Sequence, residues 1–140
     1  MEIIRNIQDS LHNDINENYI TILIGARQVG KTFLLNKINK FAKNNKFKTA
    51  FFDLEQPHIL NIFNQDDEKI INLLTNSGDI VFLDEFHYLK NASHIFKAIY
   101  DSKKKIKIFA SGSSSLEIHK HLKESLAGRK FIYNVYPCSF

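Results

Sequence analysis

The sequence contains a single cysteine, no tryptophan and only two prolines among its 140 residues. Cys138 alone cannot close an internal disulfide, which excludes the disulfide frameworks of small secreted domains. No apolar run approaches the roughly 20 residues of a membrane-spanning helix. The first residues carry scattered charges where a signal peptide would have an apolar core. We therefore expect a cytoplasmic protein without a membrane segment.

The rest of the composition is that of one globular domain, with 44% apolar and 24% charged residues. The net charge is +4, and lysines gather at Lys103, Lys104, Lys105 and Lys107. Such a cluster can attract nucleic acid, but no aromatic residue is interleaved in it as a stacking platform. A solvated loop and helix end is the interpretation that we favour, because charge alone is a weak signal. We expect nucleic-acid binding to be weak and sensitive to salt, or absent.

Apolar segments of strand length alternate with segments of helical spacing along the chain. The pattern predicts helices near Ile3–Leu11, Thr32–Asn44, after Pro57, and at Asp67–Thr75, Ser93–Asp101 and Ser115–Leu126. It predicts strands at Tyr19–Ile24, Thr49–Asp53, Asp79–Leu83, Lys105–Ala110 and Phe131–Val135. Because these strands are apolar at nearly every position, both faces of their sheet should be buried. We expect an α/β fold with a parallel sheet of about five strands and helices on both faces.

A phosphate-loop pattern, GxxxxGK[ST], is present at Gly25-Ala26-Arg27-Gln28-Val29-Gly30-Lys31-Thr32. Glycines let such a loop wrap around a phosphate, and its backbone N–H groups form an anion nest. The helix that follows presents its positive end to the same phosphates. We expect residues 25–33, Phe33 included, to bind ATP. Lys31 would reach the β- and γ-oxygens, and the Thr32 hydroxyl would ligate Mg²⁺.

Two adjacent carboxylates, Asp84 and Glu85, follow the third apolar strand. Ligands of open parallel sheets bind at the carboxyl ends of the strands, so these side chains should approach the phosphate loop. Asp84 would hold Mg²⁺, directly or through water, and Glu85 would accept a proton from the attacking water or orient it. An exposed acidic turn that caps the next element is the alternative.

For other polar residues at strand ends, the sequence gives weaker evidence of a role at the phosphates or the metal. Ser113, which we favour over Ser111, could contact the γ-phosphate, although Ser-Gly segments are also ordinary turns. Asp53 and Glu55 could approach the metal or simply face solvent. Arg129 could neutralise charge on a transferring phosphoryl group, but an arginine after a glycine turn is often a surface residue. We interpret the histidines, His87, His94, His119 and His121 among them, as structural.

The order of these motifs resembles a known family. GARQVGKTFLL, a strand ending in DLE, VFLDEFHYL, FASGSSSLEI and LAGRKFIYNVYPCSF occur in the order seen in the AAA-like ATPase domain of a large bacterial and archaeal family. Members of that family usually carry a C-terminal domain of unknown function. The phosphate-loop and Asp-Glu parts are shared by many ATPases, whereas GSSSLE and LAGR…YPxSF are more specific.

The resemblance implies the ASCE type of P-loop ATPase, a three-layer fold with strand order 5-1-4-3-2. It implies Lys31 at the phosphates, Thr32 and Asp84 at Mg²⁺, Glu85 as catalytic base and Ser113 as γ-phosphate sensor. Arg129 corresponds to the arginine of LAGR in the family, which favours a role at the phosphates. Family members continue beyond the position of Phe140. We therefore expect residues 1–140 to form the AAA-like core without the C-terminal lid and the downstream domain.

Three functions are compatible with these residues. The first is a Mg²⁺-dependent ATPase whose hydrolysis drives a conformational change, with homo-oligomers possible in the full-length protein. The second is a nucleotide-binding switch with negligible turnover. The third is a small-molecule phosphotransferase, which ranks last because adjacent Asp84 and Glu85 favour activation of water over a substrate hydroxyl.

Overall fold

The computed structural model describes residues 12, 15, 20–25, 30–102, 105–113 and, for the backbone, 130–135. Its elements follow one another in the order β1 (Ile20–Gly25), α2 (Lys31–Asn44), β2 (Thr49–Asp53), α3 (Pro57–Ile62), α4 (Asp67–Thr75), β3 (Ile80–Asp84), η1 (Phe86–Tyr88), α5 (Ala92–Asp101), β4 (Lys107–Ser113) and β5 (Lys130–Val135). The predicted helices at 3–11 and 115–126 lie outside the described residues. Within the described part of the chain, no helix is long and apolar enough to cross a bilayer.

The five strands form one parallel sheet in the order β2-β3-β4-β1-β5. The predicted α/β class, the parallel pairing and the order 1-4-3-2 are confirmed, and β5 pairs with the free edge of β1. The phosphate-loop strand β1 therefore has a neighbour on each side. Because all strands run the same way, their carboxyl ends meet at one edge of the sheet.

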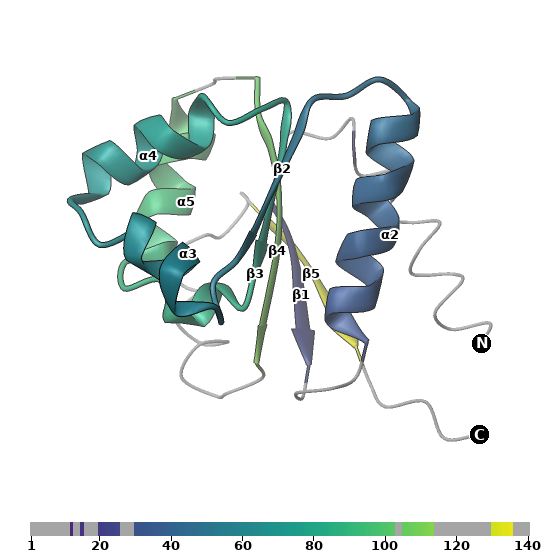
Figure 1. Cartoon of the computed structure of the whole chain (residues 1–140), viewed down its shortest axis with the longest axis horizontal. Helices are drawn as coiled ribbons and strands as arrows, with labels where there is room; N and C mark the ends of the chain where they lie inside the picture. The colour runs from purple at the N-terminus through teal and green to yellow at the C-terminus, as the bar shows by residue number, and fades with distance from the viewer. Residues whose placement is uncertain are drawn as a thin grey trace.

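Helices cover both faces of the sheet, which gives three layers (Figure 1). Helix α2 packs on one face, and α3, α4 and α5 gather on the other. Alternate residues of β3 pack into the two hydrophobic cores, one on each face of the sheet. Phe82 packs toward α2 with Leu35 and Ile38, whereas Val81 and Leu83 join the core beneath α5. All five residues of β3 are buried, the terminal Asp84 included, and the four apolar residues before it are those expected of a strand covered on both faces.

Local sequence signals set several helix boundaries as predicted. Pro57 begins α3, where its missing N–H costs nothing. Helix α4 spans the predicted residues, and the Asp66 side chain accepts a hydrogen bond from the Lys69 N–H at 2.9 Å. Gly30 precedes α2 in a left-handed conformation with φ of 93°, which glycine adopts without strain.

Most predicted boundaries lie within one residue of the structure, but those of β4 and the cap of α5 differ more. The fourth strand starts at Lys107 instead of Lys105 and continues through Ser113, beyond the predicted end at Ala110. Ser93, predicted as a helix cap, is buried inside α5, and Asn91 occupies the cap position. Asn91 donates instead to the Asp67 carboxylate, which ties the start of α5 to the start of α4.

Lys107 was predicted as part of an exposed basic cluster, and this was wrong. Its side chain is buried at the start of β4, and Nζ donates a hydrogen bond of 2.8 Å to Thr21 Oγ1 on the adjacent strand. The ammonium also lies 5.1 Å from the centroid of the Phe109 ring. Lys107 is buried because β4 lies between β3 and β1, an arrangement that the charge pattern of the sequence could not indicate.

Candidate functional site

The polar residues at the carboxyl ends of β1, β3 and β4 converge as predicted. Gly25 at the end of β1 is in register with Ser113 of β4, and β3 between β2 and β4 delivers Asp84 to the same edge. The first turn of α2 lies across this edge, so that Lys31 and Thr32 reach strands β3 and β4. The site is thus assembled from segments up to 81 residues apart in the chain.

Lys31 is buried, with only 3% of its surface exposed. Its Nζ donates to the Gly25 carbonyl at 3.0 Å and to the Gly112 carbonyl at 2.8 Å. The ammonium also lies 3.5 Å from Glu85 Oε1. A buried ammonium is costly unless hydrogen bonds replace its water, and two carbonyls do so here while a carboxylate nearby offsets the charge. The cation is thereby held between the carboxyl ends of β1 and β4.

Thr32 and Asp84 lie in direct contact. The Thr32 hydroxyl donates to Asp84 Oδ2 at 2.8 Å, and the Ser111 hydroxyl donates to Asp84 Oδ1. The Asp84 carboxylate is buried. A hydroxyl beside a carboxylate is the type of donor set that Mg²⁺ accepts when substrate phosphates and water supply its remaining ligands. The described residues contain no cluster of three or more His, Cys, Asp or Glu that could bind a metal without such a substrate. The pair therefore fits a Mg²⁺ that arrives with nucleotide.

Glu85 follows β3 in a left-handed conformation with φ of 60°. This is uncommon for a residue with a side chain, and such conformations cluster at functional sites. The Glu85 N–H donates to Ser111 Oγ at 3.0 Å, which fixes the backbone. The carboxylate is 12% exposed and lies 3.5 Å from Lys31 Nζ, 3.4 Å from His87 Nδ1 and 3.5 Å from Ser113 Oγ. The structure therefore points the Glu85 side chain at Lys31 and at the end of β4.

The two serines of β4 have different surroundings. Ser111, which we ranked below Ser113, is fully buried and joins Asp84 to the Glu85 backbone through one hydroxyl. Ser113 lies one pleat further on and faces the Glu85 carboxylate. Side chains two apart share a face of a strand, so both serines lie on the same face of β4 once the strand is extended to residue 113. The sequence prediction missed this arrangement because it ended the fourth strand too early, at Ala110 instead of Ser113.

Gly112 between them is required by packing. A Cβ atom at this position would lie 2.5 Å from Phe86 Cε1 and 2.9 Å from Cδ1. Phe86 is buried and packs against Phe96 of α5. Only glycine lets the Phe86 ring approach the β4 backbone this closely while the Gly112 carbonyl accepts from Lys31.

His87 was interpreted as structural, but it lies at the site. Its Nδ1 is 3.4 Å from Glu85 Oε2, and the Ser113 N–H points to the same nitrogen at 3.5 Å. The position of His87 depends on η1, a single turn that the sequence pattern did not predict. His94 instead pairs with Asp67 at the α4–α5 junction, 3.1 Å away, consistent with a structural role.

Other candidates do not join the site or lie beyond the described residues. The Asp53 carboxylate accepts from the Glu55 N–H and from the Gln56 side chain, so it stabilises the turn into α3. Ala26, Arg27, Gln28 and Val29 of the phosphate loop, and Arg129, are outside the described residues, so their roles stay predictions. Phe33 is 53% exposed on α2, with Lys37 above its ring.

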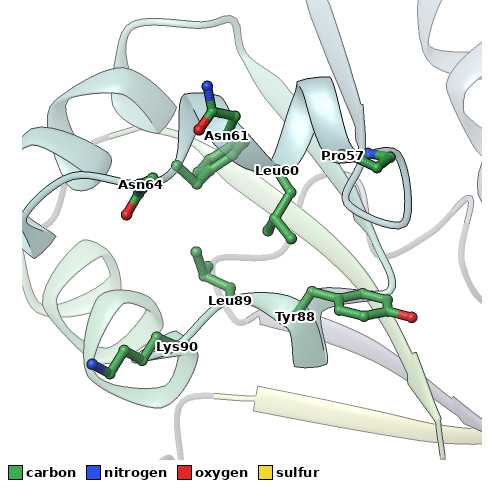
Figure 2. Close-up of a pocket in the computed structure, with 8 residues that line it drawn as sticks. Pro57, Leu60, Asn61, Asn64, Tyr88, Leu89 and Lys90 are labelled. Carbon is green, nitrogen blue, oxygen red and sulfur yellow. The ribbon is translucent and has the colours of Figure 1, made fainter.

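A separate pocket of about 360 Å³ lies between α3 and the segment that follows η1 (Figure 2). Its lining comprises Pro57, Leu60, Asn61, Phe63, Asn64, Tyr88, Leu89 and Lys90. None of these residues belongs to the phosphate loop or to the Asp84–Glu85 pair. The pocket is thus distinct from the edge of the sheet where the charged residues meet.

Comparison with known proteins agrees with this arrangement. The family model of an AAA domain matches residues 17–140. Two uncharacterized proteins of Methanocaldococcus jannaschii are similar in sequence. One is 30% identical over 138 residues, covering 93% of this chain and 28% of the relative. The other is 28% identical over 127 residues, covering 88% of this chain and 27% of the relative. The chain thus spans little more than a quarter of the length of these relatives.

A solved structure provides a comparison of the fold. AMPPCP-bound DnaA from Aquifex aeolicus superposes with a TM-score of 0.57 at 18% identity, over 92% of this chain and 44% of that protein. At this identity the likeness shows a shared fold alone. The predicted family resemblance is confirmed by the family match, which covers both the phosphate loop and the Asp84–Glu85 pair.

Proposed function

The chain belongs to a family of AAA domains, and from this premise we propose that it binds ATP with Mg²⁺ and hydrolyses the ATP to drive a conformational change. Membership of the family implies nucleotide binding. The observation that carries the rest is the convergence of Lys31, the Thr32–Asp84 pair and Glu85 at one edge of the sheet. A cation, a metal-ligand pair and a general base are the groups that phosphoryl transfer to water requires.

Lys31 is the phosphate-binding cation in this proposal. Its ammonium has three donors, and two of them are directed to the Gly25 and Gly112 carbonyls. Its contact with Glu85 is long at 3.5 Å, so phosphate oxygens can replace that carboxylate at little cost. Charge-assisted hydrogen bonds contribute about 1.5–3 kcal/mol each, which is enough for a tenfold to hundredfold effect on affinity.

Thr32 and Asp84, which share a hydrogen bond, would be the residues that hold Mg²⁺. When bound, Mg²⁺ neutralises charge on the phosphate oxygens. Ser111 keeps the Asp84 carboxylate oriented through its other oxygen. Since Ser111 also fixes the backbone of Glu85, one hydroxyl aligns the metal ligand and the base together.

Glu85 would act as the base that accepts a proton from water. Its carboxylate is mostly shielded from solvent, and its neighbours are a cation and two polar groups. General-base catalysis contributes roughly 10²–10⁴-fold to a rate. We also propose that Ser113, at the end of β4, contacts the γ-phosphate. Arg129 is proposed to do the same from the sequence alone, since it lies outside the described residues.

Calorimetric titration with ATP and Mg²⁺ tests the binding site. Lys31→Ala should weaken binding by about tenfold or more. Lys40→Ala, an exposed lysine further along the same helix, is the matched control and should bind like the parent. Unchanged affinity in a folded Lys31→Ala protein would remove the phosphate site from the proposal.

Glu85→Gln tests hydrolysis separately from binding. The variant keeps the shape of the side chain and loses the base, so it should bind ATP with near-parent affinity and turn over about 10²–10⁴-fold more slowly. Loss of binding and turnover together would assign Glu85 to the metal or to the fold. Tight binding with no turnover in the parent protein would favour a nucleotide-binding switch over an ATPase.

A further inference from the structure

We propose that His87 is the positioning residue of the Glu85 carboxylate, which it holds through its Nδ1–H. This inference rests on the proposed function, in which Glu85 is the base. It starts from the fact that the two carboxylate oxygens have different neighbours. Oε1 faces Lys31 Nζ at 3.5 Å, whereas Oε2 faces His87 Nδ1 at 3.4 Å and Ser113 Oγ at 3.5 Å.

The backbone of Glu85 is fixed, but its carboxylate is held loosely. The left-handed φ of 60° and the hydrogen bond to Ser111 define where the side chain begins. All three carboxylate contacts are 3.4–3.5 Å long, beyond the usual 2.7–3.2 Å of a formed hydrogen bond. A small movement of the side chain therefore selects which partner it bonds.

Nucleotide would remove one of these partners. Lys31 is the residue that phosphate oxygens engage, so its weak contact with Oε1 would be given up on binding. His87 and Ser113, which face Oε2, would then be left to orient the Glu85 carboxylate. Of the two, His87 donates from a ring nitrogen and Ser113 from a hydroxyl. The His87 ring is a more rigid donor than a serine hydroxyl, because the ring is packed on Tyr88 whereas a hydroxyl hydrogen rotates freely about its bond.

The η1 turn holds His87 in place for this task. Phe86 anchors the turn in the core beneath β4, and the Tyr88 and Leu89 N–H groups close it by hydrogen bonds to the Glu85 and Phe86 carbonyls, at 3.2 and 2.8 Å. The His87 ring packs on the Tyr88 ring with 4.5 Å between centroids. The imidazole is 21% exposed and presents Nδ1 to the site.

The two neighbours of Nδ1 make opposite demands on it. Glu85 Oε2 is an acceptor and needs a hydrogen on Nδ1, whereas the Ser113 N–H is a donor and needs the lone pair of the same nitrogen. Only one of them can be satisfied at a time. His87 therefore either holds the Glu85 carboxylate or bonds the end of β4, and the first of these states is the one that positions the base.

Two substitutions separate this role from a purely structural one. His87→Asn places an amide nitrogen close to the position of Nδ1, whereas His87→Phe keeps a ring that can pack on Tyr88 but removes both nitrogens. With ATP, His87→Phe should lower kcat by about tenfold, as misplaced catalytic groups do, and leave the Kd for ATP within about twofold. His87→Asn should restore most of the lost kcat. His94→Asn, which alters another histidine–carboxylate pair, should behave like the parent.

The ¹⁵N resonances of the His87 ring give a readout that needs no turnover. The Nδ1 resonance should move in Glu85→Gln, and again when AMPPCP and Mg²⁺ are added to the parent protein. It should not move in Lys40→Ala. A protein that hydrolyses no ATP but shows these shifts would refute the ATPase and leave the His87–Glu85 bond standing. Two results would overturn the role of His87: an equal kcat in the parent and His87→Phe, or an Nδ1 resonance that does not shift in Glu85→Gln. Neither result would contradict the proposed ATPase activity.

Discussion

Replacement of Gly112 by alanine should destabilise the protein through one identifiable clash. The added Cβ would lie 2.5 Å from Phe86 Cε1, about 1 Å inside normal van der Waals contact of roughly 3.5 Å. The Phe86 ring is buried against Phe96, so it cannot swing into solvent. Overpacking of this kind costs about 1–3 kcal/mol. For a chain of this length, that corresponds to a fall in Tm of roughly 3–12 °C.

A double-mutant cycle tests whether the clash is the cause. Phe86→Leu shortens the side chain that the new methyl group meets, at its own cost of about 1 kcal/mol from lost ring contacts. Urea denaturation of the parent, Gly112→Ala, Phe86→Leu and the double variant gives the coupling between the two positions. We expect the double variant to be at least about 1 kcal/mol more stable than the sum of the single effects predicts.

Gly30 supplies the contrasting case. It has φ of 93°, and among the described residues no heavy atom lies within 4 Å of the position that an alanine methyl group would occupy. Gly30→Ala should therefore cost stability through backbone strain alone, by about 1 kcal/mol. Phe86→Leu should leave that loss unchanged. Two outcomes would contradict the reasoning: Gly112→Ala is as stable as the parent, or its loss of stability simply adds to that of Phe86→Leu without coupling. Either result would mean that the close approach of the Phe86 ring to β4 is not what requires glycine at residue 112.

Three further outcomes are expected. Ser111→Ala should lower the free energy of unfolding by about 1–3 kcal/mol, because it leaves Asp84 Oδ1 and the Glu85 N–H without their shared hydroxyl; a neutral effect in urea denaturation would contradict this. Binding of DNA, measured by fluorescence anisotropy, should collapse between low and physiological salt; tight binding that persists at high salt would reveal a specific site. If Arg129 acts on a neighbouring subunit, ATPase rates should rise with protein concentration in a longer protein that includes the downstream region, and Arg129→Ala should remove most of that gain; a rate equal in the short and long proteins at every concentration would refute the idea.

The sequence alone predicted most helices and strands of the described part, and it identified Lys31, Thr32, Asp84 and Glu85 as candidates for the site. Strands apolar at nearly every position indicated a sheet buried on both faces, and their alternation with helices predicted a parallel α/β architecture. Helix α4 and strand β2 have the predicted bounds, because capping groups and β-branched or aromatic runs act over a few neighbouring residues. The spacing of Gly30, Lys31 and Thr32 likewise identified the phosphate loop before any contact was known.

Only the tertiary structure decided which side chains surround the carboxylates. Ser111 joins Asp84 to Glu85 because β4 lies beside β3, and Lys107 is buried because β1 lies on the other side of β4. His87 reaches Glu85 only because Phe86 packs beneath Gly112 and holds the η1 turn. The hydrogen bonds of Ser111 and Lys107 join residues 26 to 86 positions apart. Local propensity acts over a few residues, whereas such contacts depend on strand register and core packing, which form when the whole sheet assembles.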